Sequence, residues 1–164
     1  KLGATATHHS LLAATKNNQY NLMTTAIHNA PHTTSDLQTR GVLTDTSTAI
    51  SHGTITINHN APHSNATQRT DFLVLSDTAH ADAIPNLDTK NDNITCKHAA
   101  TISHPNDDHL FYLMTRGLNA NDATKAIVSG FFDHFINTIP IPTVQHDLRT
   151  TCTTSLGGLY AHQL

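Results

Sequence analysis

The sequence predicts a mainly β protein, in which a parallel β-solenoid is followed by a C-terminal helical region. Three observations lead to this prediction. A pentapeptide occurs twice, short β-branched runs recur between turn signals, and a helical period appears only near the end of the chain. We therefore expect residues 1–103 to form the solenoid and residues 104–164 to form a helical domain.

The repeat is the strongest of these observations. The pentapeptide His-Asn-Ala-Pro-His at 28–32 recurs letter for letter at 59–63. Short apolar runs at 42–43, 55–57 and 73–75 are separated by Gly, Asn, Asp and Pro signals. We expect short strands, about two coils in each repeat, and Thr and Asn side chains that point outward or form ladders at the corners.

The repeated pentapeptide also has the His-x-x-x-His spacing of a metal pair on a helix. Pro31 and Pro62 argue against a helix, because a proline disfavours the helical conformation of the residue before it. A corner between coils is the favoured interpretation. The 14 histidines are otherwise scattered, and most of them are expected to be exposed polar residues rather than ligands.

Helical signals begin after residue 103. Asn106 can cap a first helix, which Gly117 ends. A second helix begins at Asn119 or Asn121 and ends before Pro140. Its apolar stripe must cover another part of the protein. The stripe consists of Ala123, Ile127, Val128, Phe131, Phe132, Phe135, Ile136 and Ile139.

A third helix is expected from Thr143, with Cys152 as a core position. Because solenoids need covered ends, this helical tail can close one end of the stack.

Composition excludes several classes of protein. The net charge is -3 and the sequence has no basic cluster, so we expect no nucleic-acid partner. No apolar run approaches the ~20 residues of a spanning helix, so we expect no membrane insertion. Two cysteines far apart make a poor disulfide framework, which favours a reducing, cytoplasmic location. The first residue is not Met, and the chain is expected to be part of a longer protein.

Cys96 and His98 form the candidate site. They are two positions apart, so in a strand both side chains lie on the same face. A thiolate sulfur and an imidazole nitrogen could then bind one soft metal or an iron–sulfur species. Without further context, packing as an ordinary small apolar residue is the more common role for a buried cysteine.

Nine segments between residues 28 and 140 carry a resemblance to a known family. They are 28–36, 41–43, 68–69, 73–79, 84–88, the Cys-Lys-His-Ala-Ala-Thr run at 96–101, the Leu-Phe-Tyr-Leu-Met-Thr-Arg-Gly-Leu run at 110–118, 130–132 and 139–140. In order and spacing they resemble the SufB/SufD family of iron–sulfur cluster assembly scaffolds.

The resemblance implies a right-handed parallel β-helix followed by a C-terminal helical domain. It also implies a scaffold that is not an enzyme, which pairs with a SufB-type or identical subunit and docks the SufC ATPase through its C-terminal helices. The cluster would be held transiently at the subunit interface. Carried over to this sequence, the resemblance makes His98 the first candidate ligand and Cys96 its neighbour.

Two departures indicate a SufD-like member. SufB-like proteins have an acidic residue where this chain has Ala99, and a sulfur-accepting cysteine where it has Thr70. Two alternatives remain open: a degenerate structural partner that binds no cluster, and a β-helical zinc hydratase, which only the histidine content supports. The sequence contains no phosphate-binding loop, so the chain is not itself the ATPase.

Overall fold

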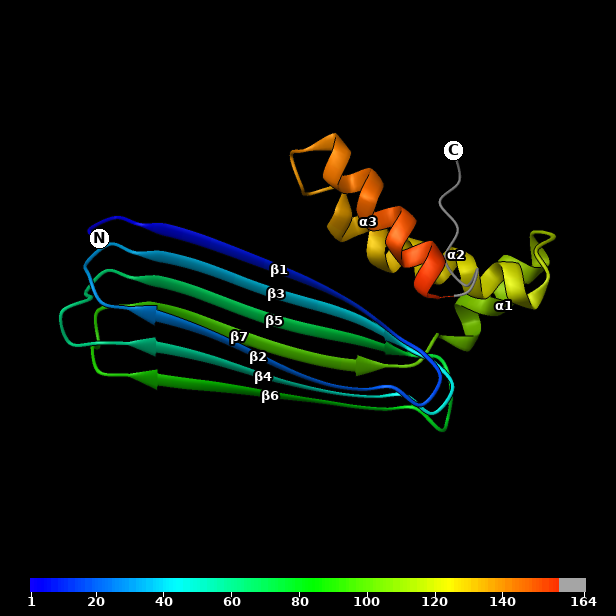
Figure 1. The fold of residues 1–164 in the computed structure, drawn as a ribbon, viewed down its shortest axis with the longest axis horizontal. Helices are drawn as coiled ribbons and strands as arrows, with labels where there is room; N and C mark the ends of the chain where they lie inside the picture. The colour runs from blue at the N-terminus through cyan, green and yellow to red at the C-terminus, as the bar shows by residue number, and fades with distance from the viewer. Residues whose placement is uncertain (157–164) are drawn as a thin grey trace.

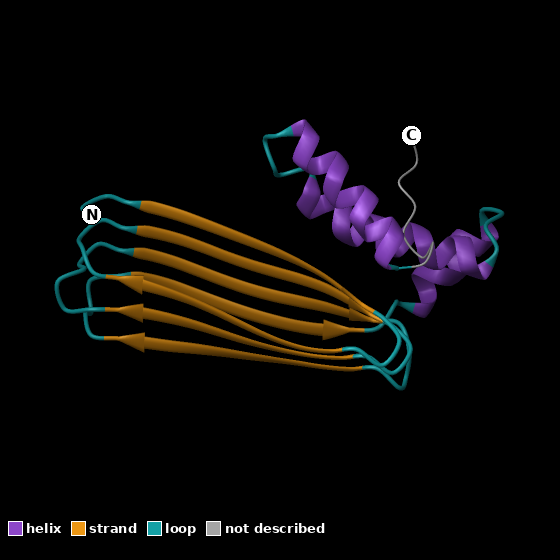
Figure 2. Ribbon diagram, in the orientation of Figure 1, coloured by secondary structure: helices purple, strands orange, loops and turns teal. Residues whose placement is uncertain are grey.

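The structure is a computed structural model that describes residues 1–156, in which parallel strands wind into a solenoid and three helices follow (Figure 1). The strands form two facing sheets with the orders β1-β3-β5-β7 and β2-β4-β6 (Figure 2). Their bounds are β1 Thr5–Ala14, β2 Gln19–His28, β3 Thr34–Leu43, β4 Thr48–Ile57, β5 Asn65–Val74, β6 His80–Thr89 and β7 Thr95–Ser103. The predicted solenoid followed by helices is confirmed.

The repeat corresponds to one coil, so the expectation of two coils per repeat is wrong. Thr5 pairs with Thr34, and Thr34 with Asn65, so each coil advances about as far as the pentapeptide spacing. Strands β1 to β6 each have 10 residues, so they are longer than the short strands expected. The error arose because Gly41 and Gly53 suggested turns, whereas both lie inside strands.

These two glycines make room for side chains from the neighbouring coil. A Cβ atom on Gly41 would lie 2.5 Å from the ring of Phe72. A Cβ atom on Gly53 would overlap the side-chain amide of Gln68. Glycine inside a strand therefore indicates close approach here rather than a break in the strand.

The interior of the solenoid contains two apolar clusters and polar side chains. One cluster consists of Leu12, Ala14, Leu43, Ala49, Phe72, Val74 and Ala81, and the other of Leu37, Ile55, Ile57, Ala61 and Ala66. Four polar side chains also point inward and are buried, namely those of Thr39, Ser51, Gln68 and Thr70. The expectation that Thr side chains point outward is therefore wrong for Thr39 and Thr70.

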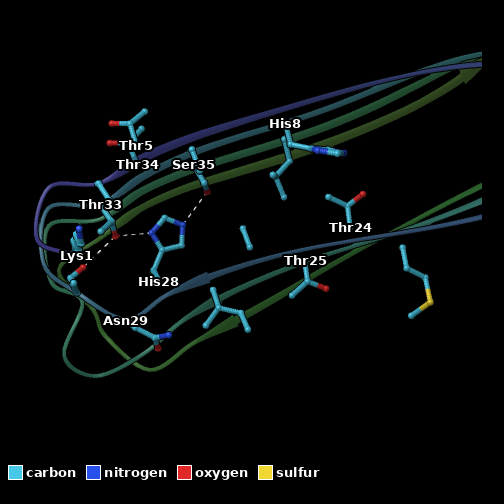
Figure 3. Close-up of a pocket in the computed structure, with 17 residues that line it drawn as sticks. Lys1, Thr5, His8, Thr24, Thr25, His28, Asn29, Thr33, Thr34 and Ser35 are labelled. Carbon is cyan, nitrogen blue, oxygen red and sulfur yellow. Dashed lines mark hydrogen bonds between the residues drawn. The ribbon is translucent and has the colours of Figure 1, made fainter.

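The histidine pentapeptides form corners, as predicted. His28 ends β2 with its ring buried, and both ring nitrogens contact hydroxyl groups: Nδ1 lies 2.7 Å from Thr33 Oγ1 and Nε2 lies 2.8 Å from Ser35 Oγ (Figure 3). Burial lowers the pKa of His28. Because both nitrogens are occupied, His28 acts as a structural residue. His32 and His63 stack at successive corners, with ring centroids 4.8 Å apart.

The helices are α1 Asp107–Thr115, α2 Ala120–Ile136 and α3 Pro142–Ser155. Asn106 caps α1 by accepting hydrogen bonds from the backbone N–H groups of Asp108 and His109, and Asn119 caps α2. The third helix begins at Pro142 rather than at the expected Thr143, because proline is well tolerated in the first turn of a helix. Residues 157–164, which belong to the expected helical domain, lie outside the described residues.

The apolar stripe of α2 packs against the outer face of the β1-β3-β5-β7 sheet, so the helices do not close an end of the solenoid as expected. The buried residues of this contact are Val42, Leu73, Val128, Phe132, Ile136, Cys152 and Leu156, with Leu11, Ala13 and Leu75 beside them. Cys152 is 5% exposed, which confirms it as a core position. Among residues 1–156, no helix has the length and apolar character needed to cross a bilayer.

Polar contacts centred on Arg40 reinforce the contact between sheet and helix. Arg40 lies on β3 and donates a hydrogen bond of 2.7 Å to the backbone oxygen of Phe131 on α2. Its Nε atom lies 3.7 Å from a carboxylate oxygen of Asp71 on β5, which also accepts a 2.7 Å bond from Arg69. The guanidinium group lies over the rings of Phe131 and Phe135. Burial lowers the pKa of Arg40, and Asp71 opposes this effect.

Candidate functional site

The two predicted site residues lie on β7, the last strand of the solenoid. β7 is at the edge of its sheet and pairs with β5 on one side only, within the described residues. Cys96 pairs with Ala66, and His98 pairs with Gln68. Ala66 and Gln68 face the interior and are buried, so Cys96 and His98 both lie on the strand face that continues this interior.

The thiol of Cys96 is half-buried against the apolar cluster that contains Leu37, Ile55 and Ala66. Burial raises the pKa of this thiol, an effect that the backbone N–H of Lys97 partly opposes. Cys96 is therefore a protonated thiol at neutral pH. Since metals bind the thiolate, a metal at this position must displace the proton.

His98 is exposed although it lies on the interior face of β7, because no further strand covers that face within residues 1–156. Apolar residues on the interior face of the strands are also exposed at this end of the solenoid. Leu87 on β6 is 39% exposed and Ile102 on β7 is 47% exposed. The last coil therefore presents an open end, with His98, Cys96 and apolar side chains on one surface.

The two positions that distinguish SufB-like proteins from this chain lie on opposite faces. Thr70 on β5 is buried, points inward and pairs with Ala100. Ala99 lies on the outward face of β7 and is exposed. A thiol in place of Thr70 would lie inside the solenoid beside this end, whereas Thr70 supplies only a hydroxyl group.

Within the described residues, no group of three or more His, Cys or Asp side chains is arranged to bind a metal ion. Sequence reasoning assigned no role to Gln68, although it lies beside His98 in the register. The alternation of inward positions along β5 indicates that Gln68 points inward, but only the register between β5 and β7 shows that His98 is its neighbour.

A second exposed feature lies on α1. Phe111, Tyr112 and Met114 are 69%, 56% and 46% exposed, and α1 has no buried residue. The guanidinium carbon of Arg116 lies 5.1 Å from the centre of the Tyr112 ring. This helix therefore carries an apolar surface that is accessible to a partner.

Comparison with known proteins decides the family. The family model for "SUF system FeS cluster assembly, SufBD core domain" matches residues 1–131. This chain belongs to the SufBD family. It is 33% identical over 128 residues to a Bacillus subtilis protein named iron-sulfur cluster assembly protein SufD, covering 78% of this chain and 29% of that protein.

Two staphylococcal relatives agree with this assignment. A SufBD family protein of Staphylococcus epidermidis is 30% identical over 139 residues, covering 85% of this chain and 30% of the relative. One of Staphylococcus saprophyticus is 32% identical over 115 residues, covering 70% and 25%. The chain thus spans less than a third of the length of these relatives. The family resemblance expected from the sequence is confirmed.

Proposed function

We propose that this chain is a SufD-like scaffold subunit that holds an iron–sulfur cluster in transit and has no enzymatic turnover of its own. The observation that carries the proposal is the position of Cys96 and His98 on one face of an edge strand, at the open end of the solenoid. An iron–sulfur cluster is usually held by about four ligands. This face offers two, and a SufB-type or identical subunit would supply the others.

The edge of β7 is the proposed contact with that subunit. An unpaired strand edge presents backbone N–H and C=O groups to a partner strand. β7 contains no proline, whereas the other edge strand at this end, β6, contains Pro85, which lacks a backbone N–H. Pairing along β7 would also cover Ile102 and enclose His98 between the subunits.

The proposed ATPase contact is the exposed apolar surface of α1. A SufC-type ATPase would bury Phe111 and Tyr112 there. Because α2 is anchored on the sheet by Phe132 and Arg40, a movement of the helices would be transmitted to β3 and β5. We expect Phe111→Asp to abolish capture of the ATPase, and Thr115→Asp, at an exposed position on the same helix, to leave it unchanged. Equal capture by both variants would refute this contact.

Cluster binding is tested by reconstitution with iron and sulfide, with and without a SufB-type partner. We expect His98→Ala to reduce the cluster content of the complex at least fivefold, Cys96→Ala to reduce it less, and His104→Ala to have no effect. The chain without a partner is expected to hold little cluster. If His98→Ala leaves the cluster content of the complex unchanged, the assignment of the site is wrong.

A second candidate function is a structural partner that binds no cluster. Thr70 in place of a thiol and the raised pKa of Cys96 favour this alternative. Iron analysis of the assembled complex distinguishes the two functions. Both cysteines are free, which supports the cytoplasmic location proposed for either function.

A further inference from the structure

Gln68 is a buried polar residue for which the fold itself supplies no complete set of partners. It lies on β5, points into the solenoid and is 5% exposed. Its amide oxygen, Oε1, is buried and accepts no hydrogen bond from any of residues 1–156. An unpaired carbonyl oxygen in a protein interior is costly and calls for an explanation.

The position of the Gln68 amide is fixed by the opposite sheet. Gly53 on β4 faces it, and any side chain on Gly53 would collide with the Gln68 amide nitrogen. The amide therefore occupies the space that a larger residue at position 53 would fill. Because this space is confined, the amide has a defined location in the interior, against Gly53 of the opposite sheet.

His98 is the residue next to Gln68 in the register. It is the Cα partner of Gln68 on the adjacent strand, and both residues point to the same face. Neighbouring strands lie about 4.8 Å apart, which is within reach of an imidazole ring. His98 is exposed, so its ring has room to rotate toward β5.

We propose that Gln68 is a positioning residue for His98. Its Oε1 atom accepts a hydrogen bond from one ring N–H of the neutral imidazole and so selects one tautomer. The lone pair of the other nitrogen is then directed to the open end, where it can bind iron. Metal-binding histidines commonly donate their second ring N–H to such an acceptor. The role in iron binding rests on the proposed function, whereas the hydrogen bond does not.

The test is nitrogen-15 NMR of the histidine rings in the full chain without iron, at a pH above 8, where imidazoles are neutral. In the wild type we expect a strong preference for one tautomer at His98. Gln68→Met removes the acceptor with little change in size and should change the tautomer ratio about fivefold, the factor that one ordinary hydrogen bond gives. Gln68→Glu keeps an acceptor oxygen and should preserve the preference.

Two further variants separate positioning from general damage to the interior. Gly53→Ala replaces neither His98 nor Gln68, but its Cβ atom displaces the Gln68 amide. It should therefore change the ratio in the same direction as Gln68→Met. Thr70→Val replaces a neighbouring inward polar residue whose register partner is Ala100, and should leave the ratio unchanged. A His98 ratio that is the same in wild type, Gln68→Met and Gly53→Ala, with circular dichroism unchanged, overturns the inference.

Cluster content separates this inference from the proposed function. A strong tautomer preference with no cluster in the reconstituted complex would overturn the function and leave the hydrogen bond standing. An unbiased ring with a normal, His98-dependent cluster would overturn the positioning role alone. If both hold, Gln68→Met should lower cluster content in the complex about fivefold, and Thr70→Val should not.

Discussion

Replacing Arg40 by Met tests how the helices are attached to the solenoid. The change keeps the length of the side chain but removes its charge and its hydrogen bond to the backbone oxygen of Phe131. It also removes one of the two cations beside Asp71, whose side chain is 7% exposed. The remaining cation, Arg69, is 54% exposed but lies closer, at 2.7 Å.

The expected loss follows from these contacts. Removing one partner of a buried ion pair costs about 3–5 kcal/mol. Arg69 still neutralises Asp71, which reduces the loss, whereas the broken charged hydrogen bond to Phe131 adds about 1.5–3 kcal/mol when considered alone. Since these terms overlap, we expect Arg40→Met to lower the free energy of unfolding by about 3 kcal/mol. For Arg69→Met, an exposed partner, we expect about 1 kcal/mol.

The assay is urea unfolding followed by circular dichroism at neutral pH. Asp71→Asn introduced into Arg40→Met should recover about 1 kcal/mol, because no partly paired carboxylate then remains buried. Hydrogen exchange should show faster opening of α2 in Arg40→Met than in Arg69→Met. Equal losses in the two single variants, or a loss below about 1 kcal/mol for Arg40→Met, would refute the reasoning.

Four further predictions concern buried or half-buried side chains. Phe132→Ala should lower the free energy of unfolding by about 3–5 kcal/mol in the same urea assay, because the residue is fully buried between α2 and the sheet. Burial and Asp133 raise the pKa of Cys152 from 9.0 to about 11. The protonated thiol therefore contributes its full share to the free energy of unfolding below pH 9, and this free energy should fall by up to about 3 kcal/mol as the pH rises to 11. Cys152→Ala should abolish this dependence on pH. Burial lowers the pKa of His28 in the folded chain, so as the pH falls the imidazole is protonated in the unfolded chain before it is protonated in the folded chain. The urea midpoint should therefore fall as the pH drops below 6.5, and His28→Gln should reduce this dependence of the midpoint on pH. Alkylation of Cys96 by iodoacetamide at pH 8, followed by mass spectrometry, should be slower in the folded chain than in urea, and equal rates would contradict its burial.

The order and type of the main elements could be predicted from local features. Asn106 caps α1 as the sequence suggested, and Asn119, one of the two predicted starts of the second helix, caps α2. The apolar stripe with Phe132 and Phe135 is buried as its period predicted. The β-branched alternation at Ile55 and Ile57 likewise marked an inward face. Each of these predictions depends on residues within a few positions of one another.

The errors concern contacts between residues that are distant in the sequence. Gly53 looked like a break because nothing local shows that Gln68 fills its space. Thr39 and Thr70 looked outward because a threonine on either face has the same local pattern. The placement of α2 on the outer face depends on Val42 and Leu73, which are far from it along the chain. The register that joins Gln68 to His98 likewise requires the structure.

The most direct test of the central claim is to identify the atom that binds the cluster. The chain is labelled with nitrogen-15 histidine, reconstituted with iron and sulfide in complex with a SufB-type partner, reduced, and examined by pulsed electron paramagnetic resonance. We predict a nitrogen coupling of directly bound histidine that disappears in His98→Ala and persists in His104→Ala. A cluster with no such coupling, or with a coupling that survives in His98→Ala, would contradict the assignment of β7 as the cluster-binding strand.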